Sequence, residues 1–255
     1  MQISAVIITF NEEKNIERCL NSLQGVVDEI IVVDSLSTDK TQEICSKYDL
    51  VKFYSQEWLG YSTQKNYANK LASFDTILSI DADEVLSFEL KQSILTVKAQ
   101  YENISNPNII FSVKRLTNYC GSWIKHCGWY PDIKKRIFNK SVQWVGDIHE
   151  ELLYLPSAKI KLLEGDLYHY SFHTTSDHIK QVEKFTDLTA KQAFEKGKKA
   201  SCFGIWFRPK WKFFRDYILL RGMLDGYAGY QVCKISSFAT FLKYTKLREY
   251  YREKE

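Results

Sequence analysis

Three acidic side chains fall within four positions in the stretch TILSIDADEV, directly after an apolar run. They are Asp81, Asp83 and Glu84, and like charges this close together repel one another unless something offsets the repulsion. Solvent around an exposed turn would offset it, and so would a divalent cation, because Mg²⁺ and Mn²⁺ take carboxylate oxygens as ligands. The stretch therefore indicates either a solvated acidic turn or a metal site.

A second pair of residues that could do chemistry lies in the stretch IHEEL. His149 beside Glu150 could supply a metal ligand and a general base together, although such a pair also occurs on ordinary surfaces. His169 and His173 have i, i+4 spacing, but the segment DLYHYSF around them is typical of a strand. We therefore do not expect a helical two-histidine metal site there.

The cysteines are a weaker indication of metal binding. Cys120, His126 and Cys127 lie close together in the sequence, but no second half of a zinc site matches them, which favours loop thiols over zinc. The six cysteines of the chain show no paired spacing, and this is typical of reduced thiols in the cytosol.

The elements that must position these residues alternate along the first half of the chain. β-Branched apolar runs predict strands, and the segments between them have the apolar spacing and capping residues of helices. The predicted strands are residues 3–9, 29–34, 51–54 and 76–80, followed later by 109–115. Strands and helices that alternate in this way predict an α/β fold with a mainly parallel sheet and right-handed crossovers.

Polar residues gather where these strands end. Thr9–Glu12 follow the first strand, Asp34 ends the second and Asp81 follows the fourth. They should face one crevice at the carboxyl edge of the sheet, where ligands of such sheets bind. The first strand leads into TFNEEKN, which is neither a GxGxxG fingerprint nor a P-loop. A divalent cation held by carboxylates would be another way to neutralise a bound phosphate.

The composition is that of a globular protein able to bury a core. The 255 residues are 45% hydrophobic and 26% charged. The first residues, MQISAVIITF, read as a first strand rather than as a signal peptide, since they lack a basic region. No uncharged apolar segment approaches the roughly 20 residues that span a bilayer. We expect a cytoplasmic protein, or one lying on the inner face of the cytoplasmic membrane without crossing it.

The charge is concentrated near the C-terminus. Residues 201–255 contain 11 Lys/Arg and 5 Asp/Glu, a net +6, and the other 200 residues carry 24 basic and 26 acidic side chains, a net −2. Aromatic residues crowd the same part, as in FGIWFRPKWKFFRDYILLRGML. Two sets have the spacing of a helix stripe: Phe213, Tyr217, Leu220 and Leu224, and Phe241, Tyr244, Leu247 and Tyr251. These stripes predict helices that bind an anionic membrane surface or that pack on the rest of the chain.

Six stretches together resemble, in their order, the family 2 glycosyltransferases of the GT-A fold. They are ISAVIITFNEEKNIERCLNSL, DEIIVVDSLSTDKT, EWLGYSTQKNYA, LSIDADEV, GWYPDIKKRIF and IHEEL. More narrowly, the set is similar to the lipopolysaccharide core β-1,4-glucosyltransferase subgroup. The resemblance implies a Rossmann-like catalytic domain at 1–175, with a nucleotide-sugar half at 1–105 and an acceptor half at 106–175. A helical extension with aromatic and basic residues would follow at 176–255.

The resemblance also implies roles for individual residues. Thr9, Phe10, Asn11, Glu12 and Asp34 would hold the nucleotide base and ribose, and Lys65 would lie near the nucleotide or its diphosphate. Asp81 and Ala82 would contact the ribose, and Asp83 would ligate Mg²⁺ or Mn²⁺. Glu150 would be the catalytic base, with Asp132 as the second candidate; His149 would join the metal shell or bind the diphosphate. The acceptor or the diphosphate would contact Trp129, Tyr130 and Arg136. One departure is Leu36, where the family pattern has glycine.

The reaction implied is inverting transfer of a sugar, glucose from UDP-glucose in this subgroup, onto a glycolipid such as the lipopolysaccharide inner core. Nucleic acid is not among the expected partners. A sugar nucleotidyltransferase is an alternative, but it would have a Gly-, Arg- or Lys-rich loop where this chain has TFNEEKN. A non-catalytic sugar- or membrane-binding protein of the same fold is another, and it would not need Asp83 or Glu150.

Overall fold

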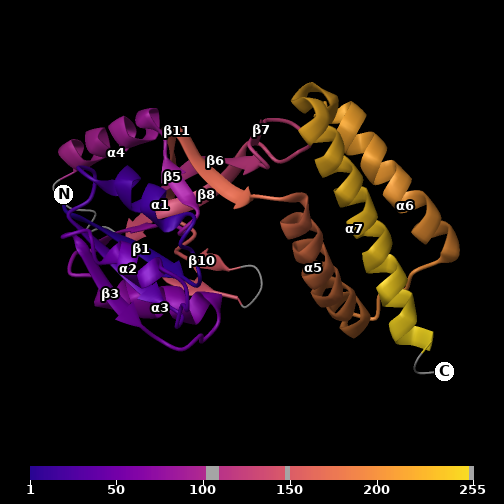
Figure 1. Ribbon diagram of the computed structural model, residues 1–255, viewed down its shortest axis with the longest axis horizontal. Helices are drawn as coiled ribbons and strands as arrows, with labels where there is room; N and C mark the ends of the chain where they lie inside the picture. The colour runs from indigo at the N-terminus through magenta and orange to yellow at the C-terminus, as the bar shows by residue number, and fades with distance from the viewer. Residues whose placement is uncertain (102–108, 147–149, 253–255) are drawn as a thin grey trace. The chain divides into compact units, whose positions relative to one another are not determined.

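The computed structural model describes residues 1–101, 109–146 and 150–252 (Figure 1). The chain forms two compact units. The sheet unit consists of Met1–Arg115 and Asp132–His169, and the helical unit consists of Leu116–Pro131 and Tyr170–Glu255. From the sequence we placed the boundary at residue 175, so the grouping of Leu116–Pro131 with the C-terminal helices is a difference from that expectation.

The central sheet has the strand order β3-β2-β1-β4-β8-β6-β11-β5. β1 pairs in parallel with β2 and β4, and β2 with β3, whereas β4–β8, β6–β8 and β5–β11 are antiparallel. The strands are β1 Ile3–Thr9, β2 Glu29–Asp34, β3 Val51–Ser55, β4 Thr76–Ser79, β5 Glu84–Leu86, β6 Ile109–Tyr119, β8 Asp132–Asn139 and β11 Lys159–Phe172. The expected α/β fold is confirmed, and the parallel part is the N-terminal half that the sequence pattern predicted.

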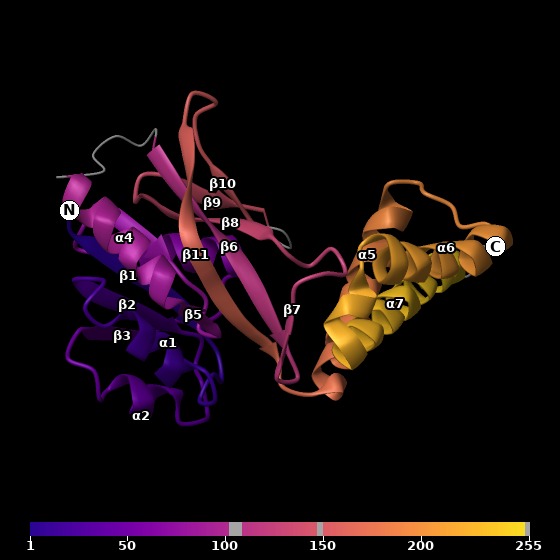
Figure 2. The ribbon, with the colours of Figure 1, turned by 90° about the horizontal axis from the view of Figure 1, so that it is seen from above.

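Helices cover both faces of the parallel strands (Figure 1), and Figure 2 shows the same strands from above. The helices of this unit are α1 Ile16–Leu23, α2 Thr41–Cys45, α3 Tyr61–Leu71 and α4 Phe88–Gln100. Side chains of β1 alternate between two cores, with Ala5 and Ile7 packing in the core that contains α1 and Val6 in the core that contains Ala68 of α3. Burial on both faces explains why β1 and β2 are continuous apolar runs rather than alternating ones.

Short strands complete the sheet unit and extend β6. β9, Gln143–Val145, pairs with β10, Glu151–Leu153, in a two-stranded sheet. β7, Ser122–Ile124, pairs with the Thr117–Tyr119 end of β6 and belongs to the helical unit. Trp144 of β9 is buried against Phe138 of β8, with their ring centroids 5.7 Å apart, so the small sheet is attached to the core beside α3.

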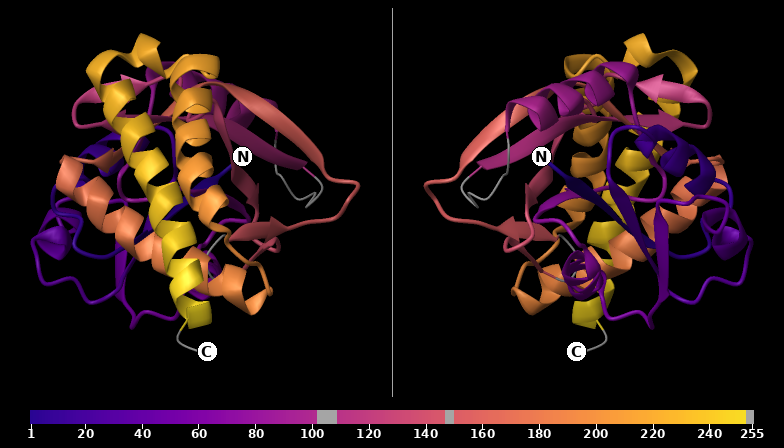
Figure 3. Two further views of the ribbon diagram at one scale, coloured as in Figure 1. Left: turned by 90° about the vertical axis from the view of Figure 1, so that its right-hand side faces the viewer. Right: turned by 90° about the vertical axis from the view of Figure 1, so that its left-hand side faces the viewer.

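In the helical unit, the last helix packs against the other long helices (Figure 3). The helical elements of this unit are α5 Thr175–Glu195, α6 Cys202–Phe214, the π-helix η1 Arg215–Leu219, the 3₁₀-helix η2 Gly222–Asp225 and α7 Gly226–Arg252. α7 packs against both α5 and α6. Thr174 and Asp177 form a capping box that begins α5. Over the described ranges, none of the helices combines the length and the apolar character that crossing a bilayer requires.

The predicted helix stripe over residues 213–224 is wrong. α6 ends at Phe214, a π-helix follows, and Arg221 has a φ of 56°, so no single helix presents the four residues on one face. Phe213 and Tyr217 stack in the core of the helical unit at 5.2 Å, whereas Leu220 and Leu224 are exposed. In the second stripe, Tyr244, Leu247 and Tyr251 pack with Ala190 and Ala193 of α5, which agrees with the packing interpretation.

Candidate active site

The turns after β1 and β2 are joined by hydrogen bonds. Asp34 accepts bonds from the Ser37 backbone N–H at 2.7 Å and from its hydroxyl at 2.5 Å. Asn11 has a φ of 55°, and its side-chain oxygen accepts the backbone N–H of Thr38 at 2.8 Å. Leu36 has a φ of 63° and an exposed side chain, so this turn keeps the left-handed geometry that glycine adopts most easily. The bonds to Asp34 stabilise a conformation that leucine disfavours by itself.

Thr9, Phe10 and Glu12 line the same edge of the sheet. The Thr9 hydroxyl is buried and has no hydrogen-bond partner among the described residues, and the Phe10 ring is exposed. Burial, together with the nearby charges of Asp83 and Asp81, raises the pKa of Glu12 to about 7, although a hydrogen bond from the Asn15 amide opposes this. Glu12 therefore lies close enough to the acidic motif to share its electrostatic field.

Protein cations offset the charge of two of the three acidic residues. Asp81 lies 2.8 Å from Arg136 and 3.2 Å from the Lys65 amine. Glu84 is fully buried, contacts the guanidinium groups of Arg136 and Arg115, and accepts the backbone N–H of Asp81 at 3.0 Å. Burial acts to raise the pKa of Asp81, but the positive charges of Arg136 and Lys65 outweigh it and hold this pKa well below its usual range. Protein cations, rather than solvent or a bound metal, therefore lie against these two carboxylates.

Asp83 differs from its neighbours because its ion-pair partner is a histidine. Its carboxylate lies 3.1 Å from Nε2 of His169, on β11. Burial lowers the pKa of His169, but the charge of Asp83 and the hydrogen bond to it prevail, so the pKa is raised. Sequence reasoning missed His169, since only the pairing of β11 with β5 brings it beside the acidic motif.

Glu150 joins the same group of charges through Lys65. The Lys65 amine, on α3, lies 3.0 Å from Glu150, and it also sits over the Trp144 ring at 4.8 Å. Its side chain is only 6% exposed, so the cation is held between two carboxylates and an aromatic face. The structure thus brings Asp81, Lys65 and Glu150 together. His149 lies outside the described residues.

The other predicted site residues have different surroundings. Asp132 pairs with Arg115 at 2.6 Å and with Lys134 at 3.1 Å; although burial raises its pKa, these cations lower it overall. Arg136 is buried between Asp81 and Glu84 rather than exposed to an acceptor. Trp129 packs in the core of the helical unit, where its ring lies 5.9 Å from that of Phe172.

Tyr130 and the cysteine cluster also belong to the helical unit. Tyr130 is half-buried and has an interaction partner. His126 pairs with Asp225 at 2.6 Å, Cys127 is buried and Cys120 is exposed. Within the described part of the chain, no group of three or more His, Cys, Asp or Glu residues has the geometry of a metal site.

The acidic edge suits a metal whose shell is completed by a substrate. Asp83 offers hard carboxylate oxygens, and Nε2 of His169 contacts one of them, Oδ2. Mg²⁺ is commonly held by one or two carboxylates together with substrate phosphates, rather than by a cage of protein ligands. The residues present therefore fit a divalent cation bound with a diphosphate, and they do not form a pre-built cage.

Comparison with known proteins decides the family. Residues 4–143, more than half of the chain, match the family described as Glycosyl transferase family 2. This chain belongs to glycosyltransferase family 2. Membership of this family favours glycosyl transfer over the alternative of sugar nucleotidyl transfer.

Relatives of this family 2 glycosyltransferase match it along nearly its whole length. An uncharacterized glycosyltransferase of Rickettsia felis is 34% identical over 258 residues, covering 97% of this chain and 90% of that protein. The lipopolysaccharide core biosynthesis glycosyltransferase LpsC of Rhizobium meliloti is 27% identical over 259 residues, covering 95% and 92%. A solved mannosyltransferase, PcManGT from Pyrobaculum calidifontis in complex with GDP-Man and Mn²⁺, has a TM-score of 0.56 at 14% identity and covers 100% of this chain and 88% of its own. This likeness supports the GT-A fold.

The buried guanidinium of Arg136 is expected to be essential for stability. Arg136→Met would leave the buried Glu84 with only its 3.5 Å contact to Arg115, and Asp81 with only Lys65, at a cost of about 3–5 kcal/mol in the free energy of unfolding. Lys140→Met is the matched control, because its pair with Asp75 at 2.9 Å is largely exposed and is worth at most about 1 kcal/mol. Urea unfolding curves of both variants measure this, and equal midpoints would contradict a structural role for Arg136.

Proposed function

We propose that this glycosyltransferase transfers a hexose from a nucleoside diphosphate sugar onto a hydroxyl of a glycolipid, with inversion of the anomeric configuration. The resemblance to the lipopolysaccharide core subgroup favours UDP-glucose as the donor. The observation that carries the proposal is the linked set of charges formed by Asp81, Lys65 and Glu150 beside the Asp83–His169 pair. It combines groups suited to hold a diphosphate with a carboxylate that can remove a proton. Similarity to the lipopolysaccharide core enzyme LpsC supports a glycolipid as the class of acceptor.

The donor would be held by the edge of the sheet unit. The base and ribose would be contacted by Thr9, Asn11 and Asp34. Asp81, whose pKa is held low, would accept a hydrogen bond from a ribose hydroxyl. Lys65 is the cation positioned to approach the diphosphate. Its ion pairs orient the amine before the donor binds, which lowers the cost of positioning. Mg²⁺ or Mn²⁺ held by Asp83 would supply Lewis-acid stabilisation of the departing diphosphate.

Glu150 is better suited than Asp132 to act as the base. Asp132 is held by two cations that lower its pKa, which makes it a weak proton acceptor. Glu150 is held by the single amine of Lys65. When Lys65 turns toward a diphosphate, this contact weakens and frees a carboxylate oxygen of Glu150 to take the proton of the acceptor hydroxyl. Binding of the donor would thus prepare the base for the acceptor.

The reaction is tested by incubating the enzyme with a panel of nucleotide sugars, Mn²⁺ and a glycolipid acceptor. The proposal predicts release of nucleoside diphosphate that depends on the acceptor. Release of pyrophosphate instead would favour a nucleotidyltransferase. Binding of the sugar nucleotide without any release would favour a non-catalytic member of the family.

The helical unit is proposed to bring the enzyme to an anionic membrane surface. α6 contains eight hydrophobic residues, a glycine and a proline among its 13, and none of its residues is buried. Phe203, Trp206 and Trp211 are each about half exposed or more, and Arg208 and Lys210 lie among them. An exposed aromatic helix with basic residues suits insertion at the interface between lipid headgroups and chains. A glycolipid acceptor would require this location.

Membrane binding predicts a result in vesicle sedimentation. The enzyme should sediment with anionic vesicles at low salt, less at high salt, and weakly with neutral vesicles, because each basic residue near the surface contributes roughly 1 kcal/mol. Phe203→Ser should weaken sedimentation, whereas Phe88→Ser, with nearly the same exposure (69% and 70%) but in the sheet unit, should not. Full recovery in the supernatant with both anionic and neutral vesicles, at low and at high salt, would contradict surface binding.

A further inference from the structure

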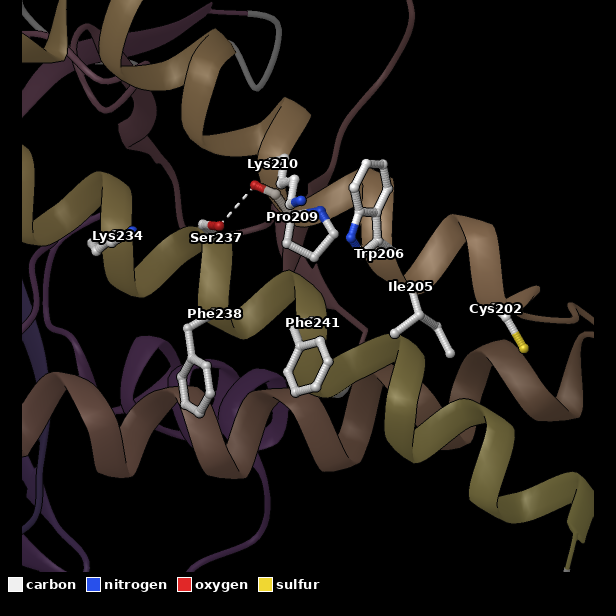
Figure 4. A pocket seen from close by; sticks show the side chains of 9 residues that line it. All are labelled: Cys202, Ile205, Trp206, Pro209, Lys210, Lys234, Ser237, Phe238 and Phe241. Atoms are coloured by element: carbon white, nitrogen blue, oxygen red, sulfur yellow. Dashed lines mark hydrogen bonds between the residues drawn. The ribbon is translucent and has the colours of Figure 1, made fainter.

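α6 and α7 enclose an open groove of about 710 Å³ within the helical unit (Figure 4). Its apolar lining comes from both helices and consists of Ile205, Trp206 and Pro209 on α6 and Phe238 and Phe241 on α7. The Phe238 and Phe241 rings are stacked, with their centroids 6.3 Å apart. The groove has the volume and the apolar lining to take a hydrocarbon chain, and three of its nine lining side chains are aromatic.

Two lysines, Lys210 and Lys234, contribute positive charge to this groove. The Lys210 amine sits over the Trp206 ring at 3.6 Å, and the Lys234 amine lies 5.0 Å from the Phe213 ring. Neither amine has a carboxylate partner in the part of the chain that the structure describes. By contrast, other lysines of this unit pair with acidic residues, Lys212 with Asp216 and Lys246 with Asp187. The groove therefore combines an apolar lining with two uncompensated cations.

The groove is held open by a contact between its two helices. Pro209 lies inside α6 and has no backbone N–H, so it interrupts the hydrogen-bond ladder of that helix. The Ser237 hydroxyl of α7 donates to the Pro209 carbonyl at 2.7 Å and fixes the two helices at this point. A groove whose walls are joined in this way needs little rearrangement to accept a ligand.

We propose that this groove binds an acyl chain of an anionic membrane phospholipid, with the phosphate of its headgroup between Lys210 and Lys234. The proposal rests on the membrane-facing role proposed above and extends it from a surface to a defined lipid site. Charge favours this occupant over a second copy of the chain, because residues 201–255 carry a net charge of +6 and would repel their own duplicate. The hydrocarbon chain would pack on the aromatic lining, and the phosphate would accept hydrogen bonds from the two amines.

The test uses the full-length protein and dihexanoyl phosphatidylglycerol, a short-chain anionic lipid, at concentrations where it is monomeric. Calorimetric titration should show binding to the wild type, weaker binding of dihexanoyl phosphatidylcholine, and none of inorganic phosphate at the same concentration. The indole of Trp206 lines the groove, so bound lipid should also change the protein's fluorescence, and this change should be absent in Trp206→Phe.

Variants of the groove separate its two parts. Ser237→Trp fills the groove, and the double variant Lys210→Glu with Lys234→Glu reverses its charge. Each should weaken binding of the anionic lipid by about tenfold or more. In Ser237→Trp the indole occupies the space of the acyl chain, and in the double variant two basic contacts are lost, which near an anionic lipid are worth at least that factor. Lys191→Glu, an exposed lysine of α5 outside the groove, is the matched control and should leave binding unchanged.

Several outcomes would overturn the proposal. They are no lipid binding by the wild type, unchanged binding by both groove variants, inorganic phosphate binding as tightly as the lipid, or a dimer that Ser237→Trp dissociates. Sugar transfer to a water-soluble, delipidated acceptor is measured on the same variants and should stay at the wild-type rate. Because lipid titration and transfer are independent readouts, failure of the groove proposal can be told apart from failure of the proposed function.

Discussion

Asp83→Asn is expected to reduce sugar transfer by roughly 10³-fold or more, because it would remove the proposed ligand of the metal, whose stabilisation of the departing diphosphate would be worth several kcal/mol. Asparagine keeps the shape of the side chain and an oxygen that can accept from His169, so the fold should remain intact. Nucleotide affinity should also lose its dependence on Mn²⁺. Rates at saturating donor, and nucleotide binding with and without chelator, measure both effects.

The matched control for this substitution is Asp75→Asn. Asp75 directly precedes β4, the strand that leads to the acidic motif, but its carboxylate is exposed and pairs with Lys140 at 2.9 Å, so transfer should be unaffected. Near wild-type transfer by Asp83→Asn, with nucleotide binding still dependent on Mn²⁺, would show that the metal is held elsewhere or not at all. If transfer is lost and circular dichroism shows that the variant is unfolded, Asp83 has a structural role instead.

Glu150→Gln is expected to lower turnover by about 10²-fold or more while donor affinity stays within a few-fold of wild type, because the change removes basicity and little else. The Lys65 amine can still donate a hydrogen bond to the amide oxygen at this position, so the geometry next to Asp81 should persist. Steady-state kinetics should therefore show a fall in kcat with little change in the KM for the donor.

Asp132→Asn is the comparison that decides between the two carboxylates. If Glu150 is the base, this variant retains most of its turnover and loses some stability, because Arg115 loses its charged partner at 2.6 Å and the carboxylate it keeps, that of Glu84, lies 3.5 Å away. The opposite pattern, with Asp132→Asn inactive and Glu150→Gln active, would exchange the two roles. Equal activity of both variants would mean that neither carboxylate removes the acceptor proton.

The sheet unit was predictable because its strands carry a strong local signal. β1 and β2 are continuous β-branched runs, and β2 and β4 end next to the acidic residues that mark the edge of the sheet. Local sequence could not show what offsets the acidic charge. Arg115 and Arg136 come from β6 and β8, and His169 comes from β11, so these contacts depend on pairings between strands far apart in the chain.

The helical unit was harder to predict for a related reason. An apolar stripe does not reveal whether a partner covers it: Leu247 is fully buried, whereas Phe241, six residues earlier, is exposed in the groove. The break after Phe214 was also hidden, because residues 215–219 have ordinary helical composition. The resemblance implied a contact of Trp129 with the acceptor or the diphosphate, and local sequence could not show that its ring packs with those of Tyr119 and Phe172.

The most direct test of glycosyl transfer by this protein is to follow nucleoside diphosphate and sugar product together. Wild-type enzyme, UDP-glucose, Mn²⁺ and a glycolipid acceptor should yield UDP and glucosylated acceptor in equal amounts, with the anomeric configuration opposite to that of the donor as read by NMR. Omitting the acceptor should largely stop UDP release. Transfer with retained configuration would contradict a direct displacement by the acceptor hydroxyl with Glu150 as its base. The absence of nucleoside diphosphate with every donor sugar tried would contradict glycosyl transfer itself.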